Sequence, residues 1–287
     1  EYCMCRFVAY KGRDIFMSDL LTRSARSLIQ QSFKAREREE PLNGDGFGVG
    51  WYAHEIDPAP GLFTSVRPAW GNRNLIRLAP VIKSTCFFAH VRAATAGSPI
   101  TELNCHPFQY RRFLWMHNGK IAGFRKIKRR LQEHLDDEFY DQICGTTDSE
   151  HAFALFLHQL RRHLHDYNLE TLQKAMRSTI AKIERWVSSI NEDEPTHLNF
   201  AVTDGHNMIA TRYVTDKVAT PQTLYVAKGE RLEIREGQYR MVTSGNLVES
   251  VIIASEPLTE AVEDWQAIPA NHMVSVSPEL HVKVAEV

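Results

Sequence analysis

The sequence predicts an α+β protein in which helices pack outside two β-sheets. Three observations support this fold class. Short apolar runs typical of strands come first, two long segments with helical spacing follow between residues 147 and 190, and β character returns after Pro195. Strands, then helices, then strands suit layered sheets. The chain shows no repeat and no linker composition, so we expect one domain.

The composition is that of an ordinary globular protein. The 287 residues are 43% apolar and 24% charged, with a formal net charge of −1, so the charge balance favours neither nucleic acid nor an anionic membrane as a partner. No run approaches the ~18 apolar residues of a membrane span, and the start of the chain does not resemble a secretory signal. The five cysteines include no C-x-x-C pair. We therefore predict no disulfide framework, no zinc site and a cytoplasmic location.

Strands and turns dominate the first half of the chain. Residues 7–10 are predicted to form a strand that ends at Lys11-Gly12, and a helix is expected to end near Phe33. The alternate glycines of residues 44–50 match no nucleotide-binding fingerprint, so a tight turn leading into a strand explains them better. Further strands are predicted at residues 63–66, 86–91 and 113–116, and the last is expected to stop at the turn signal His117-Asn118-Gly119.

Helices are predicted from residue 124. Residues 124–135 form a basic amphipathic pattern, which we interpret as a solvated face rather than a binding patch because the whole chain is nearly neutral. The pattern Thr147-x-x-Glu150 is a capping box that opens a second helix, and residues 169–190 keep helical spacing throughout. The remaining strands are predicted at 198–203, 208–213, 224–227, 241–243, 251–254, 273–276 and 282–284.

The first candidate for chemistry is Cys5, which stands at the mouth of the first strand. A cysteine at a chain start carries its own base, because its α-amine has a reference pKa of about 7.7–8.0 and can accept the thiol proton. If Met4 is the initiator, its removal leaves Cys5 first. Residues 1–4 would then be a leader, a remnant or a pro-segment. The alternative is an ordinary buried strand cysteine.

Three further patterns carry polar groups that suit an amino-acid ligand. Arg92 can hold a carboxylate with two parallel hydrogen bonds, or it can form a structural ion pair. Asn118 and Gly119 can donate hydrogen bonds to an oxyanion, or they can form a plain turn. Asp148 can hold an ammonium group, or it can favour the start of the helix beside it. The residues alone leave each pair of alternatives open.

The histidines give a weaker signal. No carboxylate lies at metal-ligand spacing from them, so we predict surface or core histidines and no metal site. The pair Cys105-His106 suggests a nucleophile with its base. Adjacent residues on a strand point to opposite faces, however, so we discount that pair.

Taken together, these motifs resemble the class II glutamine amidotransferases, a group of N-terminal-nucleophile hydrolases. No motif is decisive singly, but the combination is specific and spans nearly the whole chain. Within the family, the chain looks closest to stand-alone γ-glutamyl amide hydrolases of the glutathione-degradation and ergothioneine-pathway type. The motifs that carry the resemblance are Met4-Cys5-Arg6, Asn43-Gly44-Asp45-Gly46-Phe47-Gly48-Val49-Gly50-Trp51, His90-x-Arg92-x-x-Thr95-x-Gly97, Asn104-Cys105-His106-Pro107-Phe108, His117-Asn118-Gly119, Thr147-Asp148-Ser149-Glu150 and Ala254-Ser255-Glu256-Pro257.

The resemblance implies a four-layer αββα sandwich, with residues 5–287 as a glutamine amidotransferase type 2 domain. It implies that Cys5 is the nucleophile and that Asn118 and Gly119 stabilise the oxyanion. Arg92 and Asp148 would bind the α-carboxylate and the α-ammonium of a γ-glutamyl group. Further implied substrate-binding residues are Thr95, His117, Asn43 and Asp45. No cofactor is needed, since an amine base and two hydrogen-bond donors suffice for acyl transfer.

These expectations lead to one main hypothesis and two alternatives. The main hypothesis is an amidohydrolase that cleaves glutamine or another small γ-glutamyl compound through a γ-glutamyl thioester on Cys5. The first alternative is a glutaminase subunit that delivers ammonia to a separate partner enzyme. The second is a non-catalytic regulatory module, which applies if residues 1–4 stay attached, because the nitrogen of Cys5 is then an amide without basicity.

Overall fold

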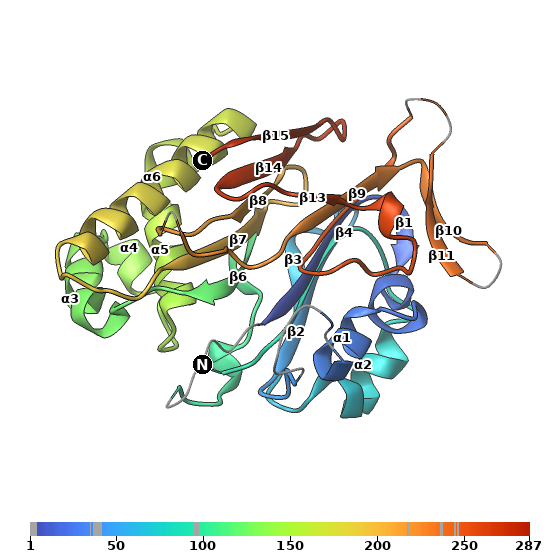
Figure 1. Cartoon of the computed structure of the whole chain (residues 1–287), viewed down its shortest axis with the longest axis horizontal. Helices are drawn as coiled ribbons and strands as arrows, with labels where there is room; N and C mark the ends of the chain where they lie inside the picture. The colour runs from blue at the N-terminus through green and yellow to red at the C-terminus, as the bar shows by residue number, and fades with distance from the viewer. Residues whose placement is uncertain are drawn as a thin grey trace.

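The structure is a computed structural model that describes residues 5–34, 36, 42–94, 98–216, 218–235, 238–243, 245 and 247–287, with the backbone alone described at residues 234, 235 and 238. Two antiparallel sheets form its centre (Figure 1). The seven-stranded sheet has the order β13-β9-β12-β1-β4-β2-β3, and the six-stranded sheet has the order β15-β14-β8-β7-β6-β5. The nucleophile candidate therefore precedes a strand, β1, that lies inside its sheet with a neighbour on each side.

The strands of the seven-stranded sheet are β1 (Arg6–Phe16), β2 (Phe47–Ala53), β3 (Asp57–Ser65), β4 (Lys83–Val91), β9 (Tyr225–Gly229), β12 (Ser250–Ala254) and β13 (Gln266–Ala267). Those of the six-stranded sheet are β5 (Phe108–Tyr110), β6 (Phe113–Lys120), β7 (His197–Thr203), β8 (Met208–Arg212), β14 (His272–Val276) and β15 (Val282–Glu286). A separate hairpin consists of β10 (Arg231–Arg235) and β11 (Gln238–Val242).

The α-helices are α1 (Leu28–Lys34), α2 (Arg73–Leu78), α3 (Phe124–His134), α4 (Asp137–Tyr140), α5 (Asp148–Leu160) and α6 (Leu169–Ser188). Short 3-10 turns are η2 (Ala69–Gly71), η3 (Glu102–Asn104), η4 (Arg161–His163) and η5 (Val262–Asp264), and η1 (Asp19–Arg23) is a π-helix. No helix within the described ranges is both long and apolar enough to cross a bilayer.

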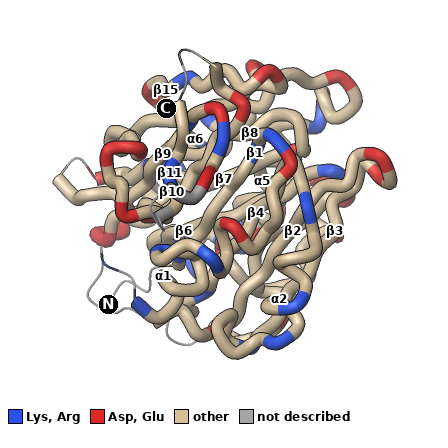
Figure 2. Tube along the Cα trace, turned by 90° about the vertical axis from the view of Figure 1, so that its right-hand side faces the viewer, with Lys and Arg blue, Asp and Glu red and all other residues tan. Residues whose placement is uncertain are grey.

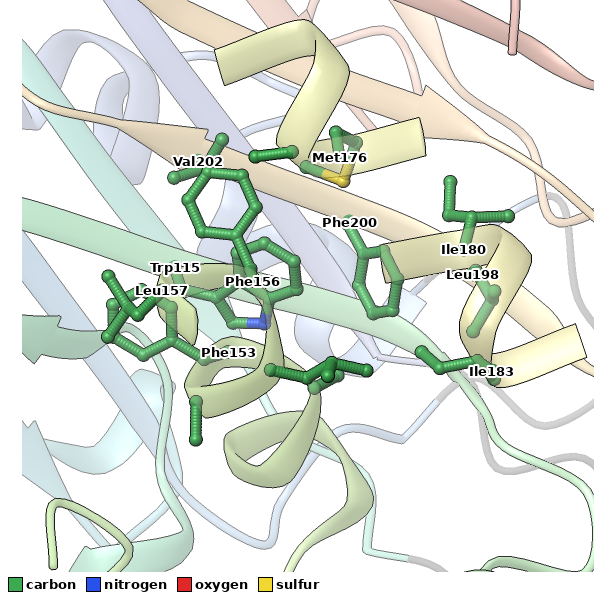
Figure 3. Close-up of a cluster of buried hydrophobic side chains, with 14 of the residues drawn as sticks. Trp115, Phe153, Phe156, Leu157, Met176, Ile180, Ile183, Leu198, Phe200 and Val202 are labelled. Carbon is green, nitrogen blue, oxygen red and sulfur yellow. The ribbon is translucent and has the colours of Figure 1, made fainter. Parts of the chain in front are cut away.

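Three buried clusters show how these elements stack into four layers. One cluster joins the six-stranded sheet to α3, α5 and α6, and it includes Trp115, Phe156 and Phe200 (Figure 3). A second cluster joins the other face of the seven-stranded sheet to η1, α1 and α2. The third cluster lies between the two sheets. Figure 1 shows the same order, with α3 to α6 outside one sheet and α1 and α2 outside the other. The order α, β, β, α is the four-layer sandwich that the resemblance implies.

The two long helices form where the sequence predicts them, for local reasons. Thr147 caps α5 by accepting a hydrogen bond from the backbone N–H of Glu150 at 3.2 Å. The reciprocal half of the capping box is absent, since the Glu150 carboxylate accepts from the N–H groups of Cys144 and Gly145 instead. Asn168 and Thr171 form a complete capping box at the start of α6.

Several strands run further than predicted, among them β3 and β4, which begin at Asp57 and Lys83, and two extensions pass through predicted strand ends. The first strand continues through Lys11-Gly12 to Phe16, and the run that was expected to turn at His117-Asn118-Gly119 stays in β6 and pairs with β7 as far as Lys120. The turn interpretation of Asn118-Gly119 is therefore wrong. A local turn preference is small, and pairing with a neighbouring buried strand overrides it.

Charged side chains are distributed along the whole trace without segregation by sign. Figure 2 shows Lys and Arg interspersed with Asp and Glu, in agreement with the net charge of −1. Cations that line a cavity are described below.

Candidate active site

Cys5 lies at the edge of a cavity of about 560 Å³ between the two sheets' ends. The N–H of Ala93 donates to the Cys5 sulfur at 3.4 Å, and the thiol donates to the Ala93 carbonyl oxygen at 3.5 Å. Ala93 follows β4, and the pairing of Arg6 with Val91 brings the start of β1 beside the end of β4. Phe7 and Ala9 belong to the cluster between the sheets, so the alternation of a strand directs Cys5 to that same side.

A buried ion pair anchors the residue that follows Cys5. The guanidinium group of Arg6 contacts the Glu256 carboxylate at 2.7 and 2.8 Å, and both side chains are 1% exposed. The same guanidinium donates to the carbonyl oxygen of Cys5 at 3.0 Å. Glu256 follows β12, the neighbour of β1 on its other side. The Ala254-Ser255-Glu256-Pro257 motif therefore has a physical role here, since it holds the backbone of the nucleophile candidate.

We expect Glu256→Ala to lower the free energy of unfolding by about 3–5 kcal/mol, because it leaves the Arg6 charge buried without its carboxylate. Urea unfolding measures this change. Glu260→Ala is the matched control, since Glu260 pairs with Arg36 at 3.0 Å on the surface, where such a pair contributes about 0–1 kcal/mol. Equal losses in the two variants contradict the anchoring role of Glu256.

Arg92 lines the cavity directly after β4 and is only 4% exposed. It donates to the Ser98 hydroxyl at 3.0 Å and to the Pro99 carbonyl oxygen at 3.4 Å. Among the described residues, no carboxylate forms an ion pair with it. The alternative of a structural ion pair for Arg92 therefore has no support among the described residues. A buried guanidinium bonded to neutral oxygens retains strong attraction for an anion.

Asp45 supports the segment that carries Arg92. Its carboxylate accepts a hydrogen bond from Ala94 N–H at 2.8 Å, and its N–H donates to the Arg92 carbonyl oxygen at 3.1 Å. Neither Asp45 nor Asn43 is among the residues that line the cavity, so the geometry suits positioning rather than contact with a ligand. Thr95, which was expected to help bind the substrate, lies outside the described residues.

Asp148 lines the same cavity as Arg92 and is the first residue of α5. One carboxylate oxygen accepts from Ile121 N–H at 2.8 Å, and the other accepts from Ser149 N–H at 2.9 Å. Each carboxylate oxygen has more than one acceptor site, so both can still accept from an ammonium group in the cavity. The helix-start role and the ligand role of Asp148 are therefore compatible.

Asn118 lies in β6 and is completely buried. Leu114 and Met116 belong to the cluster between the sheets, so the alternation of β6 directs Asn118 to that side, which Cys5 shares. Neither polar atom of its amide has a hydrogen-bond partner among the described residues. A buried amide without partners costs about 1–3 kcal/mol. Asn118 is not among the residues that line the cavity, although its neighbour Gly119 is, so its amide is adjacent to the site and has bonding capacity to spare.

Gly119 lines the cavity next to Asn118. Its φ angle is +153°, and a Cβ atom there would lie 2.1 Å from the His197 carbonyl oxygen. No larger residue fits this close approach without moving the backbone. Glycine at this position therefore lets β6 lie close to His197 at the cavity wall.

His117 faces the helix side of β6 and connects three elements. Its Nε2–H donates to the His197 carbonyl oxygen at 2.9 Å, and its Nδ1 accepts from the Ser149 hydroxyl at 2.9 Å. Burial lowers the pKa of His117, so the ring is neutral and both nitrogens are used. His117 lines the cavity, but these bonds suit it to hold β6 against the start of α5.

Some cavity residues were not predicted from the sequence. His106 lines the cavity with its ring stacked on His90 at 4.2 Å, and neither ring nitrogen has a partner among the described residues. Burial lowers the pKa of His106 well below its usual value. Cys105 faces a second cavity of about 430 Å³ together with Cys144, so the Cys105-His106 pair is indeed separated. Cys105 and His106 do not lie in a strand, however. The signal that could have identified His106 was its position in the Asn104–Phe108 motif.

Cationic side chains also reach the cavity from β6 and α3. Lys120, Arg125 and Lys128 are among its lining residues. The basic face of α3 is solvent-accessible as predicted, with Arg125 exposed and Lys128 half-buried, and these two cations line the cavity as well. Which face of a helix meets a cavity depends on tertiary packing, and overall net charge carries no information about it.

The arrangement matches the chemistry of acyl transfer on a zwitterionic head group. A thiol, a buried guanidinium and a carboxylate share one cavity. A buried amide and a glycine N–H lie on the neighbouring strand. Within the described ranges, no three His, Cys, Asp or Glu side chains come together as a metal site.

Comparisons with known proteins give a consistent result. Residues 17–281 match the family model of the class-II glutamine amidotransferases. Over 295 residues the chain is 42% identical to the probable glutamine amidotransferase DUG3 of Saccharomyces cerevisiae, with 96% of this chain and 82% of that protein aligned. It is 26% identical over 283 residues to the gamma-glutamyl-hercynylcysteine sulfoxide hydrolase of Mycolicibacterium smegmatis, with 98% and 99% aligned.

A solved structure agrees with the fold. A glutamine aminotransferase class-II domain protein of Silicibacter pomeroyi superposes with a TM-score of 0.65 and 27% identity, covering 98% of this chain and 99% of that one. The four-layer sandwich expected from the resemblance is thereby confirmed. Cys5 precedes the residues that the family model matches, so its role is argued from the contacts above.

Proposed function

Because the chain belongs to the class-II glutamine amidotransferases, we propose that it hydrolyses γ-glutamyl amides through a thioester formed on Cys5. The observation that carries this proposal is the buried Arg92, which has no carboxylate partner in the described part of the chain and faces the same cavity as Cys5 and Asp148. The mycobacterial relative is named as a hydrolase of a γ-glutamyl compound, which supports the same type of bond here.

Recognition rests on charge complementarity at the two walls of the cavity. Arg92 binds the α-carboxylate of the glutamyl group, and Asp148 binds its α-ammonium. Fixing both groups orients the side chain and brings the γ-carbonyl to the sulfur. Asp45 and His117 act as positioning residues, because their hydrogen bonds hold the segments that carry Arg92 and Asp148.

Acylation begins with attack of the Cys5 sulfur on the γ-carbonyl carbon. A C–S bond forms, the carbonyl π electrons move to oxygen, and the thiol proton passes to the α-amine of Cys5. The amide of Asn118 and the N–H of Gly119 donate to the oxyanion. The oxyanion then collapses, the C–N bond breaks, and the α-ammonium returns its proton to the departing amine.

Deacylation repeats these steps with water. The α-amine accepts a proton from water as its oxygen attacks the thioester carbon. The C–S bond breaks, glutamate leaves, and the sulfur regains its proton. Glutamate release is therefore the direct readout. If protein that begins at Cys5 releases no glutamate from glutamine, glutathione and γ-glutamyl anilide, the proposed function is wrong.

We expect Arg92→Gln to lower kcat/KM for γ-glutamyl anilide by a factor on the order of 10², because the substrate carboxylate loses a buried charged partner. Initial rates of aniline release measure this change. The anilide of 4-aminobutyrate, which lacks the α-carboxylate, is the matched control substrate.

On that control substrate, Arg92→Gln and the unmodified protein should differ little. A drop of equal size on both substrates contradicts the carboxylate role, since it indicates a general disturbance of the site. Unchanged activity on γ-glutamyl anilide contradicts it as well.

A further inference from the structure

The cavity has a cationic wall that recognition of the glutamyl head does not use. Its described lining residues include the cations Arg92, Lys120, Arg125 and Lys128, against the single carboxylate of Asp148. A volume of about 560 Å³ falls in the range of sites that enclose drug-sized ligands, and it exceeds the needs of one glutamyl group. Arg92 follows β4 and is bonded to Ser98 and Pro99, whereas Lys120 ends β6 and Arg125 and Lys128 lie in α3. We call the side of the cavity lined by these last three cations the α3 wall.

The basic residues of α3 divide into two sets. Those that face away from the cavity have partners: Lys126 pairs with Glu192 at 3.0 Å, Arg129 pairs with Glu133 at 2.9 Å, and Arg130 donates to the Ser189 hydroxyl at 3.0 Å.

Arg125 and Lys128 form the second set. They lie three residues apart and hence on one face, and both line the cavity. Neither forms an ion pair within the described ranges. Lys120, which also lines the cavity, is already paired with Glu194 at 2.6 Å.

From this division we infer that Arg125 and Lys128 form a subsite for an anionic group on the leaving amine of the substrate. The inference rests on the proposed function and adds to it the two residues that select an acidic leaving amine. Arg92 and Asp148 take up the glutamyl head. The α3 wall is the remaining charged surface of the described cavity, and its sign selects a carboxylate over a neutral or cationic substituent.

The test compares γ-glutamylglycine with γ-glutamylglycinamide, which differ only in the charge of the leaving amine. Protein that begins at Cys5 should show the higher kcat/KM for γ-glutamylglycine. In Arg125→Gln/Lys128→Gln, the ratio of the two kcat/KM values should fall about fivefold to tenfold, as expected for two partly exposed ion pairs. Added salt should lower the ratio of the unmodified protein as well.

Lys126→Gln/Arg129→Gln is the matched control, because it removes the same charge from the outward face of the same helix. The ratio of kcat/KM for γ-glutamylglycine to that for γ-glutamylglycinamide should be the same in this variant as in the unmodified protein. Arg125→Glu/Lys128→Glu should invert the preference, so that γ-glutamyl-ethylenediamine becomes better than γ-glutamylglycine.

The outcomes distinguish failure of the subsite inference from failure of the proposed function. If the unmodified protein cleaves both dipeptide analogues with equal kcat/KM, the subsite is absent although the proposed function stands. If the Gln variant loses the same factor on both substrates, the two cations act on the glutamyl head and the inference is wrong. If no substrate is cleaved by the unmodified protein, the proposed function itself fails.

Discussion

Cys5→Ala is expected to lower glutamate release by a factor on the order of 10⁴ or more, because Cys5 is the one thiol among the described residues that line the cavity. Two other described thiols, Cys105 and Cys144, lie elsewhere. Cys105 faces the second cavity, and burial raises its pKa to about 11. Glutamate release from γ-glutamyl anilide measures the loss, and mass spectrometry of acid-quenched protein shows whether a γ-glutamyl adduct forms.

Cys144→Ala is the control for that experiment. Cys144 is an exposed cysteine that lines the second cavity, so its removal should leave both the rate and the adduct unchanged. Cys5→Ala protein that still releases glutamate at the normal rate contradicts the thioester mechanism.

A peptide bond on the nitrogen of Cys5 is expected to lower the rate by about 10²–10⁴, which is the usual contribution of a general base. An amide nitrogen has no basicity near neutral pH, whereas a free α-amine titrates at about 7.7–8.0. The comparison uses two preparations, one beginning at Cys5 and one retaining residues 1–4. Intact mass establishes the first residue of each preparation.

The pH dependence gives an independent check on the base. For the protein that begins at Cys5, kcat/KM should rise with pH through the titration of the α-amine, because only the neutral amine accepts a proton. The extended protein should lack that limb. Full activity in a sample whose mass includes residues 1–4 contradicts the role of the amine.

Much of the fold was predictable because the signals are local. Helices α5 and α6 have caps at Thr147 and Asn168 and apolar residues at helical spacing, and these features act within a few residues of one another. The extensions of β1 and β6 were not predictable, because they depend on partner strands far away in the chain. Gly12 illustrates this dependence. A Cβ atom there would lie 2.4 Å from the Glu249 carbonyl oxygen, so the glycine marks a close strand approach that was interpreted as a turn.

The site was predictable in its residue types but not in its geometry. The guanidinium group of Arg92 and the amide of Asn118 indicate which groups they can bind, and this can be read from the sequence. The packing of the sheets decides two further features, namely the orientation of Asn118 and the lack of a described ion pair at Arg92. His106 was discounted because a strand was assumed at that position. That Arg125 and Lys128 line the cavity was not predicted, because net charge averages over the chain and does not resolve one face of α3.

The contact between Arg6 and Glu256 spans 250 residues, and it has a consequence for biosynthesis. Cys5 is translated before the segment that completes its surroundings, because β1 gains its second neighbour, β12, only after residues 250–254 have been translated. The backbone of Cys5 therefore lacks its Arg6–Glu256 anchor until residue 256 has been added. A chain truncated before β12 is expected to contain the sulfur without the finished pocket around it.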